Sequence, residues 1–179
     1  MTIDKFLPDE ETRVRLRELP DDGPVVMLNL LEFVAGGELF YGAYGRTALP
    51  QILKRGGRIL YSGVSVFDDP KAGHWDRLIL VEYPSRAAFL DMMADPEYQR
   101  GLPHREAALK RTELYAFQPS NEPGAPPLQS VATEGGDEIF VLNLLRFKAE
   151  RGRENYQKYS RVSMPMILEC GGSLILVLE

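Results

Sequence analysis

Cysteine and histidine are scarce in this chain of 179 residues, which contains one cysteine and two histidines. The single Cys170 cannot form an internal disulfide, and the N-terminus lacks the basic-then-apolar pattern of a signal peptide. We therefore expect a reducing, cytoplasmic environment. Neither His74 nor His104 stands at metal-ligand spacing with cysteine or acidic residues, so we predict no metal site and no cofactor. Haem ligation by His104 stays open at this stage.

Positive charge in excess and long apolar runs are also missing. The formal net charge is −5 and the pI is near 5.2, which argues against a surface that coats phosphate groups. The longest apolar runs are interrupted by Asn or Arg and fall well short of the roughly 20 residues that span a bilayer. No glycine-rich phosphate loop and no Gly-x-Ser-x-Gly elbow occurs. We predict that the protein binds neither nucleic acid nor membrane.

An internal repeat is the most informative feature that is present. The sequence VVMLNLLEF at 25–33 returns as IFVLNLLRF at 139–147. After one inserted residue, seven further positions recur: Tyr41, Tyr44, Arg46, Pro50, Leu53, Gly56 and Gly57 match Tyr156, Tyr159, Arg161, Pro165, Leu168, Gly171 and Gly172. Because the matches fall at strand, helix and turn positions alike, they indicate the duplication of one folding unit.

Hydrophobic patterning predicts the elements of the first copy. Strands are expected at 25–33, 58–67, 75–83 and 112–117, and helices at 39–55, from Ser85, from Asp95 and at 104–110. A short helix at 9–19 precedes them. The order β-α-β-β-α-β is that of the ferredoxin-like fold, so the fold class is α+β.

The chain divides into four predicted segments: an N-terminal helical extension at 1–22, a complete ferredoxin-like domain at 23–118, a Pro/Gly linker at 119–136 and a partial second copy at 137–179. The partial copy is expected to hold strands at 139–147 and 173–178 around a helix at 155–170. It lacks its middle strand, which leaves backbone groups unpaired. Either another segment fills that gap or the natural chain continues past Glu179, and we favour continuation.

Several short motifs in the first copy resemble those of the DUF1330 family: Tyr44, Pro50, Gly56-Gly57, Glu82-Tyr83-Pro84-Ser85, Asp95-Pro96-Glu97-Tyr98 and His104-Arg105-Glu106. The resemblance covers about residues 20–118, and the second copy resembles the first half of the same domain. It implies a dimeric α/β barrel, in which two four-stranded sheets pack face to face, and hence a homodimer. It implies no reaction, because the family is named for its unknown function and a fold that hosts many functions predicts none.

Asn29 and its repeat Asn143 are the uncharged polar residues within the two apolar strands. A buried amide must find a partner or cost about 1–3 kcal/mol. Asn29 therefore either holds a ligand or makes a structural hydrogen bond. Tyr44 is a second ligand-binding candidate, with core packing and a hydroxyl at the rim as the alternative.

The run His104-Arg105-Glu106 is the densest cluster of chemically capable side chains. Histidine can act as a general acid or base, which makes His104 the catalytic candidate, and Arg105 can grip a carboxylate with two hydrogen bonds. Neighbouring helical residues point about 100° apart, so these side chains cannot all face one pocket. Ion pairs on the helix surface are the alternative.

Glu82 is a further ligand-binding candidate. It belongs to a strand with Leu78 and Leu80, and if it is buried it requires a partner such as Arg58 or Arg105.

We hypothesise a small-molecule-binding α/β barrel protein with cofactor-free chemistry on an acidic or carbonyl-bearing ligand. The alternative is a non-catalytic structural or interaction module. A pocket lined by Asn29, Tyr44 and His104 favours the first, and a filled interior favours the second.

Overall fold

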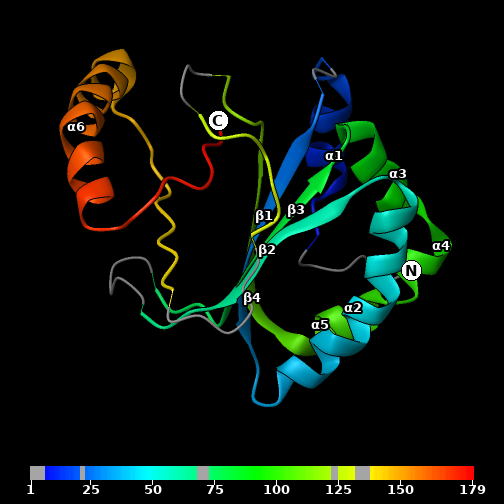
Figure 1. Cartoon of the computed structure of the whole chain (residues 1–179). Helices are drawn as coiled ribbons and strands as arrows, with labels where there is room; N and C mark the ends of the chain where they lie inside the picture. Colours follow the sequence, from blue (N-terminus) through cyan, green and yellow to red (C-terminus); the bar gives the residue numbers. More distant parts are fainter. Residues whose placement is uncertain (1–6, 21–22, 68–72, 122–124, 132–137) are drawn as a thin grey trace. The chain divides into compact units, whose positions relative to one another are not determined.

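The computed structural model describes residues 7–20, 23–67, 73–121, 125–131 and 138–179. The chain forms two compact units, shown in Figure 1. Unit 1 comprises residues 1–133 together with 177–179, and unit 2 comprises residues 134–176. Each unit is described by itself.

Unit 1 contains a four-stranded antiparallel sheet. Its strands are β1 (Val25–Phe33), β2 (Arg58–Val64), β3 (Arg77–Tyr83) and β4 (Leu109–Phe117). Their order in the sheet is β2-β3-β1-β4, and every neighbouring pair is antiparallel. The first and second strands are thus separated by the third, which confirms the predicted ferredoxin-like arrangement.

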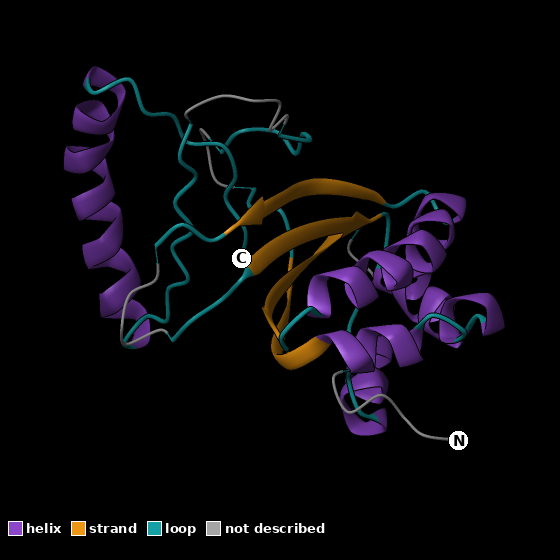
Figure 2. Cartoon of the chain, turned by 90° about the horizontal axis from the view of Figure 1, so that it is seen from below, coloured by secondary structure: helices purple, strands orange, loops and turns teal. Residues whose placement is uncertain are grey.

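The helices of unit 1 are α1 (Glu10–Glu18), α2 (Gly37–Lys54), α3 (Arg86–Ala94), α4 (Pro96–Gln99) and α5 (Leu102–Ala108). Figure 2 shows the helices that follow β1 gathered on one side of the sheet. The predicted caps are confirmed, because Ser85 Oγ accepts from Ala88 N at 3.1 Å and Asp95 Oδ1 accepts from Glu97 N at 2.8 Å. Gly56 ends α2 with a φ of +73°, a left-handed conformation that suits glycine.

The core of unit 1 is built around β1, which is buried on both faces as its apolar sequence predicts. Val25 and Met27 face the helices and join a cluster with residues of α2, α3 and α4. Val26 and Leu28 point to the opposite face and are also buried. A strand buried on both sides cannot show polar alternation, which explains the near-continuous apolar run.

The predicted linker contributes to the edge of the sheet. Val131 N donates to Leu60 O of β2 at 2.7 Å, and Ser130 Oγ donates to Ile59 O at 3.1 Å. Residues 122–124 and 132–137 of the predicted linker lie outside the described residues. Beyond β4, Pro119 forms an isolated antiparallel bridge with Leu178. The described part of the linker is therefore anchored to unit 1 by hydrogen bonds.

Several boundary predictions are wrong. β2 ends at Val64 and not at residue 67, and β3 begins at Arg77 and not at residue 75. Lys110 is not helical, since α5 ends at Ala108 and β4 begins at Leu109. β4 begins early because Leu109 already pairs with Phe33, across an irregularity in the register.

Unit 2 contains one helix, α6 (Ala149–Glu169), which includes most of the helix predicted at 155–170 and begins earlier. Its described residues contain no strand, so the strands predicted at 139–147 and 173–178 are not formed there; Leu178 itself belongs to unit 1. A strand needs a hydrogen-bonded neighbour, and the repeat has no counterpart of β3 to supply one. The partial second copy therefore stays a prediction.

Truncation of Leu31 tests the core around β1. Leu31 is 0% exposed and clusters with Ala108 and Leu109. We expect Leu31→Ala to lower the free energy of unfolding by about 2–5 kcal/mol, because it leaves a cavity. The control Leu39→Ala alters a side chain that is 82% exposed, so it should change that free energy by less than about 0.5 kcal/mol. Urea unfolding followed by circular dichroism measures both free energies. Equal effects of the two substitutions would contradict the placement of Leu31 in the core.

Asp95 should make the stability of unit 1 depend on acidity. Its carboxylate accepts a hydrogen bond from Arg55 Nη2 at 2.7 Å, and this contact lowers the pKa of Asp95 below its ordinary value of 3.8. Because the pKa of Asp95 is lowered in the folded state, its ionised carboxylate adds to the free energy of unfolding. This contribution is complete above pH 3.8 and is lost as the pH falls through the folded-state pKa.

We expect Asp95→Asn, which keeps the cap acceptor and removes the charge, to weaken the loss of stability between pH 5 and about pH 2. Urea unfolding across that range measures it. Asp91→Asn is the matched control, since Asp91 also pairs with Arg55 but is exposed. An unchanged acid profile in Asp95→Asn would refute the role of this carboxylate.

Candidate functional site

A pocket of about 100 Å³ lies in unit 1 between α2 and the side of the sheet that faces the helices. We call it the inner pocket. Most of its lining is apolar and comes from all four strands and from α2 and α3: Met27, Ala48, Leu49, Ile52, Ile59, Ile79, Val81, Phe89 and Leu114, together with Leu7 and Gly45. Its polar groups belong to Asn29, Tyr41, Tyr44, Tyr83 and Arg105. An apolar pocket with a few polar groups is typical of a small-molecule site.

Asn29 lies at the centre of the sheet. It is opposite Ile79 of β3 on one side and Leu114 of β4 on the other, and it shares the helix-facing side of β1 with Met27. Its Nδ2 donates to Met27 O at 3.3 Å. Its Oδ1 accepts no hydrogen bond from the described residues, so this oxygen remains available to a donor in the pocket.

Three tyrosines line the pocket: Tyr41, Tyr44 and Tyr83. The ring centroids of Tyr41 and Tyr44 are 5.2 Å apart, and the hydroxyl oxygen of Tyr44 lies 2.9 Å from that of Tyr98, which is outside the pocket lining. Burial raises the pKa of Tyr41, Tyr83 and Tyr98 well above the ordinary value of 10.0. These three hydroxyls therefore stay protonated at neutral pH, and that of Tyr83 donates to Met92 Sδ at 3.3 Å.

Arg105 brings a positive charge to the inner pocket. The residue is 2% exposed, and its guanidinium carbon lies 6.0 Å from the centroid of the Tyr44 ring. A buried cation is costly unless polar or charged groups surround it, and an arginine can hold a carboxylate by two parallel hydrogen bonds. The pocket thus combines a cation with neutral donors.

The structure separates His104 from its neighbour Arg105. His104 is exposed on α5 and does not line the inner pocket, whereas Arg105 does. The roughly 100° between adjacent helical side chains accounts for the difference. The geometry gives His104 no contact with the pocket, so the prediction of His104 as a general acid or base receives no support from its position.

Glu82 also lies away from the inner pocket. It alternates with Val81, which lines the pocket, and so points to the opposite face of the sheet. There its Oε2 accepts from Arg58 Nε at 2.5 Å, which is one of the two partners that the sequence suggested. Of the five predicted site residues, Asn29, Tyr44 and Arg105 therefore meet in one pocket.

The sequence did not single out Tyr41, which lines the pocket, or Tyr98, whose hydroxyl contacts that of Tyr44. Tyr41 was noted only as a repeated position, and Tyr98 only within the Asp-Pro-Glu-Tyr motif. The helix start at Pro96 orients Tyr98 towards α2, where it is buried beside Tyr44. That motif was the available signal, because a proline at the first helical position fixes the direction of the turn that follows.

The part of the chain that the structure describes offers neither a metal site nor a helix that spans a membrane. No cluster of histidine, cysteine and acidic side chains there could hold a metal ion. None of the helices described combines the length and the apolar character needed to cross a bilayer.

Comparison with known proteins identifies relatives of unit 1. Residues 38–117 match the family model described as a domain of unknown function, DUF1330. This chain is similar to the crystal structure of methylated RPA0582 protein, with 33% sequence identity and a TM-score of 0.58. The match covers 66% of this chain and 96% of the RPA0582 chain. A second structure of RPA0582, a protein of unknown function from Rhodopseudomonas palustris, is 32% identical, with 65% and 98% covered and a TM-score of 0.58.

A dimeric ferredoxin-like protein of unknown function from Thermobifida fusca is 14% identical, with 53% of this chain and 90% of that chain covered and a TM-score of 0.42. Its dimeric state is a property of that protein, so self-association of this chain stays a prediction. No functionally curated protein matched. On the match to residues 38–117 and the identity with RPA0582, the chain belongs to the DUF1330 family.

Proposed function

We propose that unit 1 binds a small organic molecule that carries an acidic or carbonyl group, and that the inner pocket is its site. The observation that carries this proposal is the burial of Arg105 beside Asn29 and the tyrosines of a mostly apolar pocket. A cation in such a place favours an anionic or strongly polarised oxygen over water.

The arrangement of the lining sets the direction in which a ligand would bind. Tyr41 packs against the buried cluster of Leu31, Ala108 and Leu109 where α5 meets β4, whereas Ile52 and Phe89 belong to the larger core cluster. A ligand would place its oxygen atoms beside the polar groups and its apolar part beside the latter residues. The volume of about 100 Å³ limits it to a few heavy atoms, well below the 300–1,000 Å³ of sites for drug-sized molecules. Short-chain oxo acids have this size and polarity.

The chemistry available to such a ligand is stabilisation of negative charge. Protonated tyrosines and Arg105 can donate to a carboxylate or to a developing enolate oxygen, in the manner of an oxyanion hole. The described residues that line the pocket include no histidine, cysteine or carboxylate that could remove a proton. Binding and polarisation of the ligand are therefore the functions that this set of groups supports best.

A non-catalytic interaction module is the second candidate function. The hydrogen bond between Tyr44 and Tyr98 favours it, because this pair satisfies part of the polar lining within the protein. The two candidates differ in whether an added small molecule binds to the inner pocket.

Arg105→Met tests the proposed site, with His104→Ala as its matched control on the neighbouring position. We use 2-oxobutanoate as the probe and isothermal titration calorimetry as the measurement. Loss of a charge-assisted contact should weaken binding of the probe roughly ten- to a hundredfold in Arg105→Met. His104→Ala should leave binding unchanged, because His104 is exposed outside the pocket.

Tyr44→Phe provides a second test in case Arg105→Met does not fold, because it removes one hydroxyl and preserves the ring. We expect this variant to keep the wild-type unfolding temperature within a few degrees and to bind the probe more weakly. The proposal is refuted if the wild-type chain does not bind 2-oxobutanoate, or if His104→Ala and Arg105→Met weaken binding equally.

A further inference from the structure

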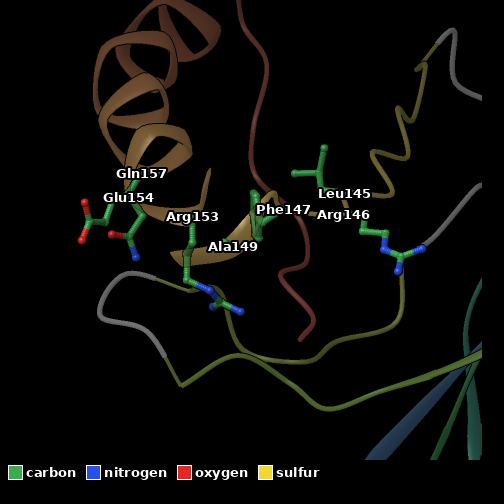
Figure 3. A pocket seen from close by; sticks show the side chains of 7 residues that line it. All are labelled: Leu145, Arg146, Phe147, Ala149, Arg153, Glu154 and Gln157. Carbon is green, nitrogen blue, oxygen red and sulfur yellow. The ribbon is translucent and has the colours of Figure 1, made fainter. Parts of the chain in front are cut away.

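Unit 2 carries an open recess of about 630 Å³, which is separate from the inner pocket. It lies between the end of the 139–147 segment and the first turns of α6, and Figure 3 shows the side chains that line it. They are Leu145, Arg146, Phe147, Ala149, Arg153, Glu154 and Gln157. We call it the unit 2 recess.

Aromatic packing beside the unit 2 recess matches that of unit 1 at the repeated positions. The ring centroids of Phe147 and Tyr156 are 5.4 Å apart, as are those of Phe33 and Tyr41. The corresponding planes meet at 50° and 51°. The sequence repeat is thus accompanied by the same local arrangement of side chains.

The end of the helix is also alike in the two units. Gly172 N donates to Ile167 O at 2.9 Å, and Gly57 N donates to Ile52 O at 3.0 Å. Unit 1 can therefore indicate what would cover the surface beside the 139–147 segment and the start of α6.

In unit 1 the corresponding surface is covered by the junction of α5 and β4. Val34 N donates to Ala108 O at 3.0 Å, and a Cβ atom at Gly37 would lie 2.2 Å from the same oxygen. Ala108 and Leu109 pack against Leu31 in a fully buried cluster. This close approach leaves no space for water between the junction and the start of α2.

Residues 138–176 of unit 2 contain no second helix and no strand that could play this part. Leu145, which repeats Leu31, is 47% exposed, and Val141 is 78% exposed. The backbone of 141–147 makes no backbone hydrogen bond to any described residue. The recess thus presents both apolar side chains and strand-like backbone groups to a partner.

The charges around the recess are the inverse of those in unit 1. Glu32 of β1 contacts Lys110 Nζ at 2.5 Å and Arg111 Nε at 3.2 Å. The repeated position is Arg146. Consider a strand that pairs with 139–147 in the way that β4 pairs with β1. It would meet the positive charge of Arg146, whereas β4 meets the carboxylate of Glu32.

This inversion makes β4 of another copy of this chain an unfavourable partner, because its Lys110 and Arg111 would face the positive charge of Arg146.

We propose that the unit 2 recess is a docking site for a strand of a partner protein that carries acidic side chains at the places that Lys110 and Arg111 occupy in β4. The partner strand adds to the backbone of 139–147, and its apolar residues cover Leu145 and Phe147. Its carboxylates pair with Arg146.

The test uses the complete 179-residue chain and two fluorescent synthetic peptides. One peptide has the sequence of residues 102–117, and the other has the same sequence with K110E and R111E. Fluorescence anisotropy should show about tenfold tighter binding of the acidic peptide, because two pairs change from repulsion to attraction. R146E in the chain should abolish or reverse that preference.

R151E is the matched control for R146E, since it changes the net charge equally at an exposed residue that does not line the recess. It should leave the preference for the acidic peptide in place. Hydrogen exchange locates the peptide, and we expect protection of amides in 141–147 and not in 25–33.

Four outcomes overturn the proposal. They are absence of binding by both peptides, equal binding of the two, an equal effect of R151E and R146E, and protection confined to 25–33. The last would mean that the peptide had replaced the α5–β4 junction of unit 1.

Discussion

Burial of β1 on both faces is the constraint on which the rest of unit 1 depends. The strand lies between β3 and β4, with the helices against one face and further buried apolar residues on the other. A side chain that is buried in such a strand is in a low-dielectric environment. A polar residue is therefore stable there only if it has a hydrogen-bond partner or serves a function. Asn29 is the residue on which this requirement falls.

The inner pocket follows from the same constraint. Asn29 on β1 shares the pocket with Tyr41 and Tyr44 from α2, Tyr83 from β3 and Arg105 from α5. Burial raises the pKa of Tyr41 and Tyr83 and so keeps their hydroxyls neutral, while a guanidinium keeps its charge. Neutral donors and one cation around an apolar space favour an oxygen-rich ligand, and this combination distinguishes the pocket from an ordinary packed core.

Much of the fold could be predicted from the sequence because strand order, caps and turns have local causes. Ser85, Asp95 and Gly56 act within a few residues of themselves, and the repeat marked the limits of β1 and α2. The direction of side chains on α5 could not be predicted, since a helix of 7 residues has too few apolar positions to fix which side is buried. Strands in unit 2 were predicted from the repeat of the first copy, whereas a strand forms only where another strand accepts its hydrogen bonds.

Asp95 serves three elements at once. Its carboxylate caps α4 and binds the arginine that follows α2, and its backbone N–H donates to Met92 O at the end of α3. A substitution at this position alters all three, so during evolution residues 55 and 95 should change together rather than singly. In an alignment of relatives, covariation of residues 55 and 95 would show whether α2 and α3, which line the inner pocket, are conserved together.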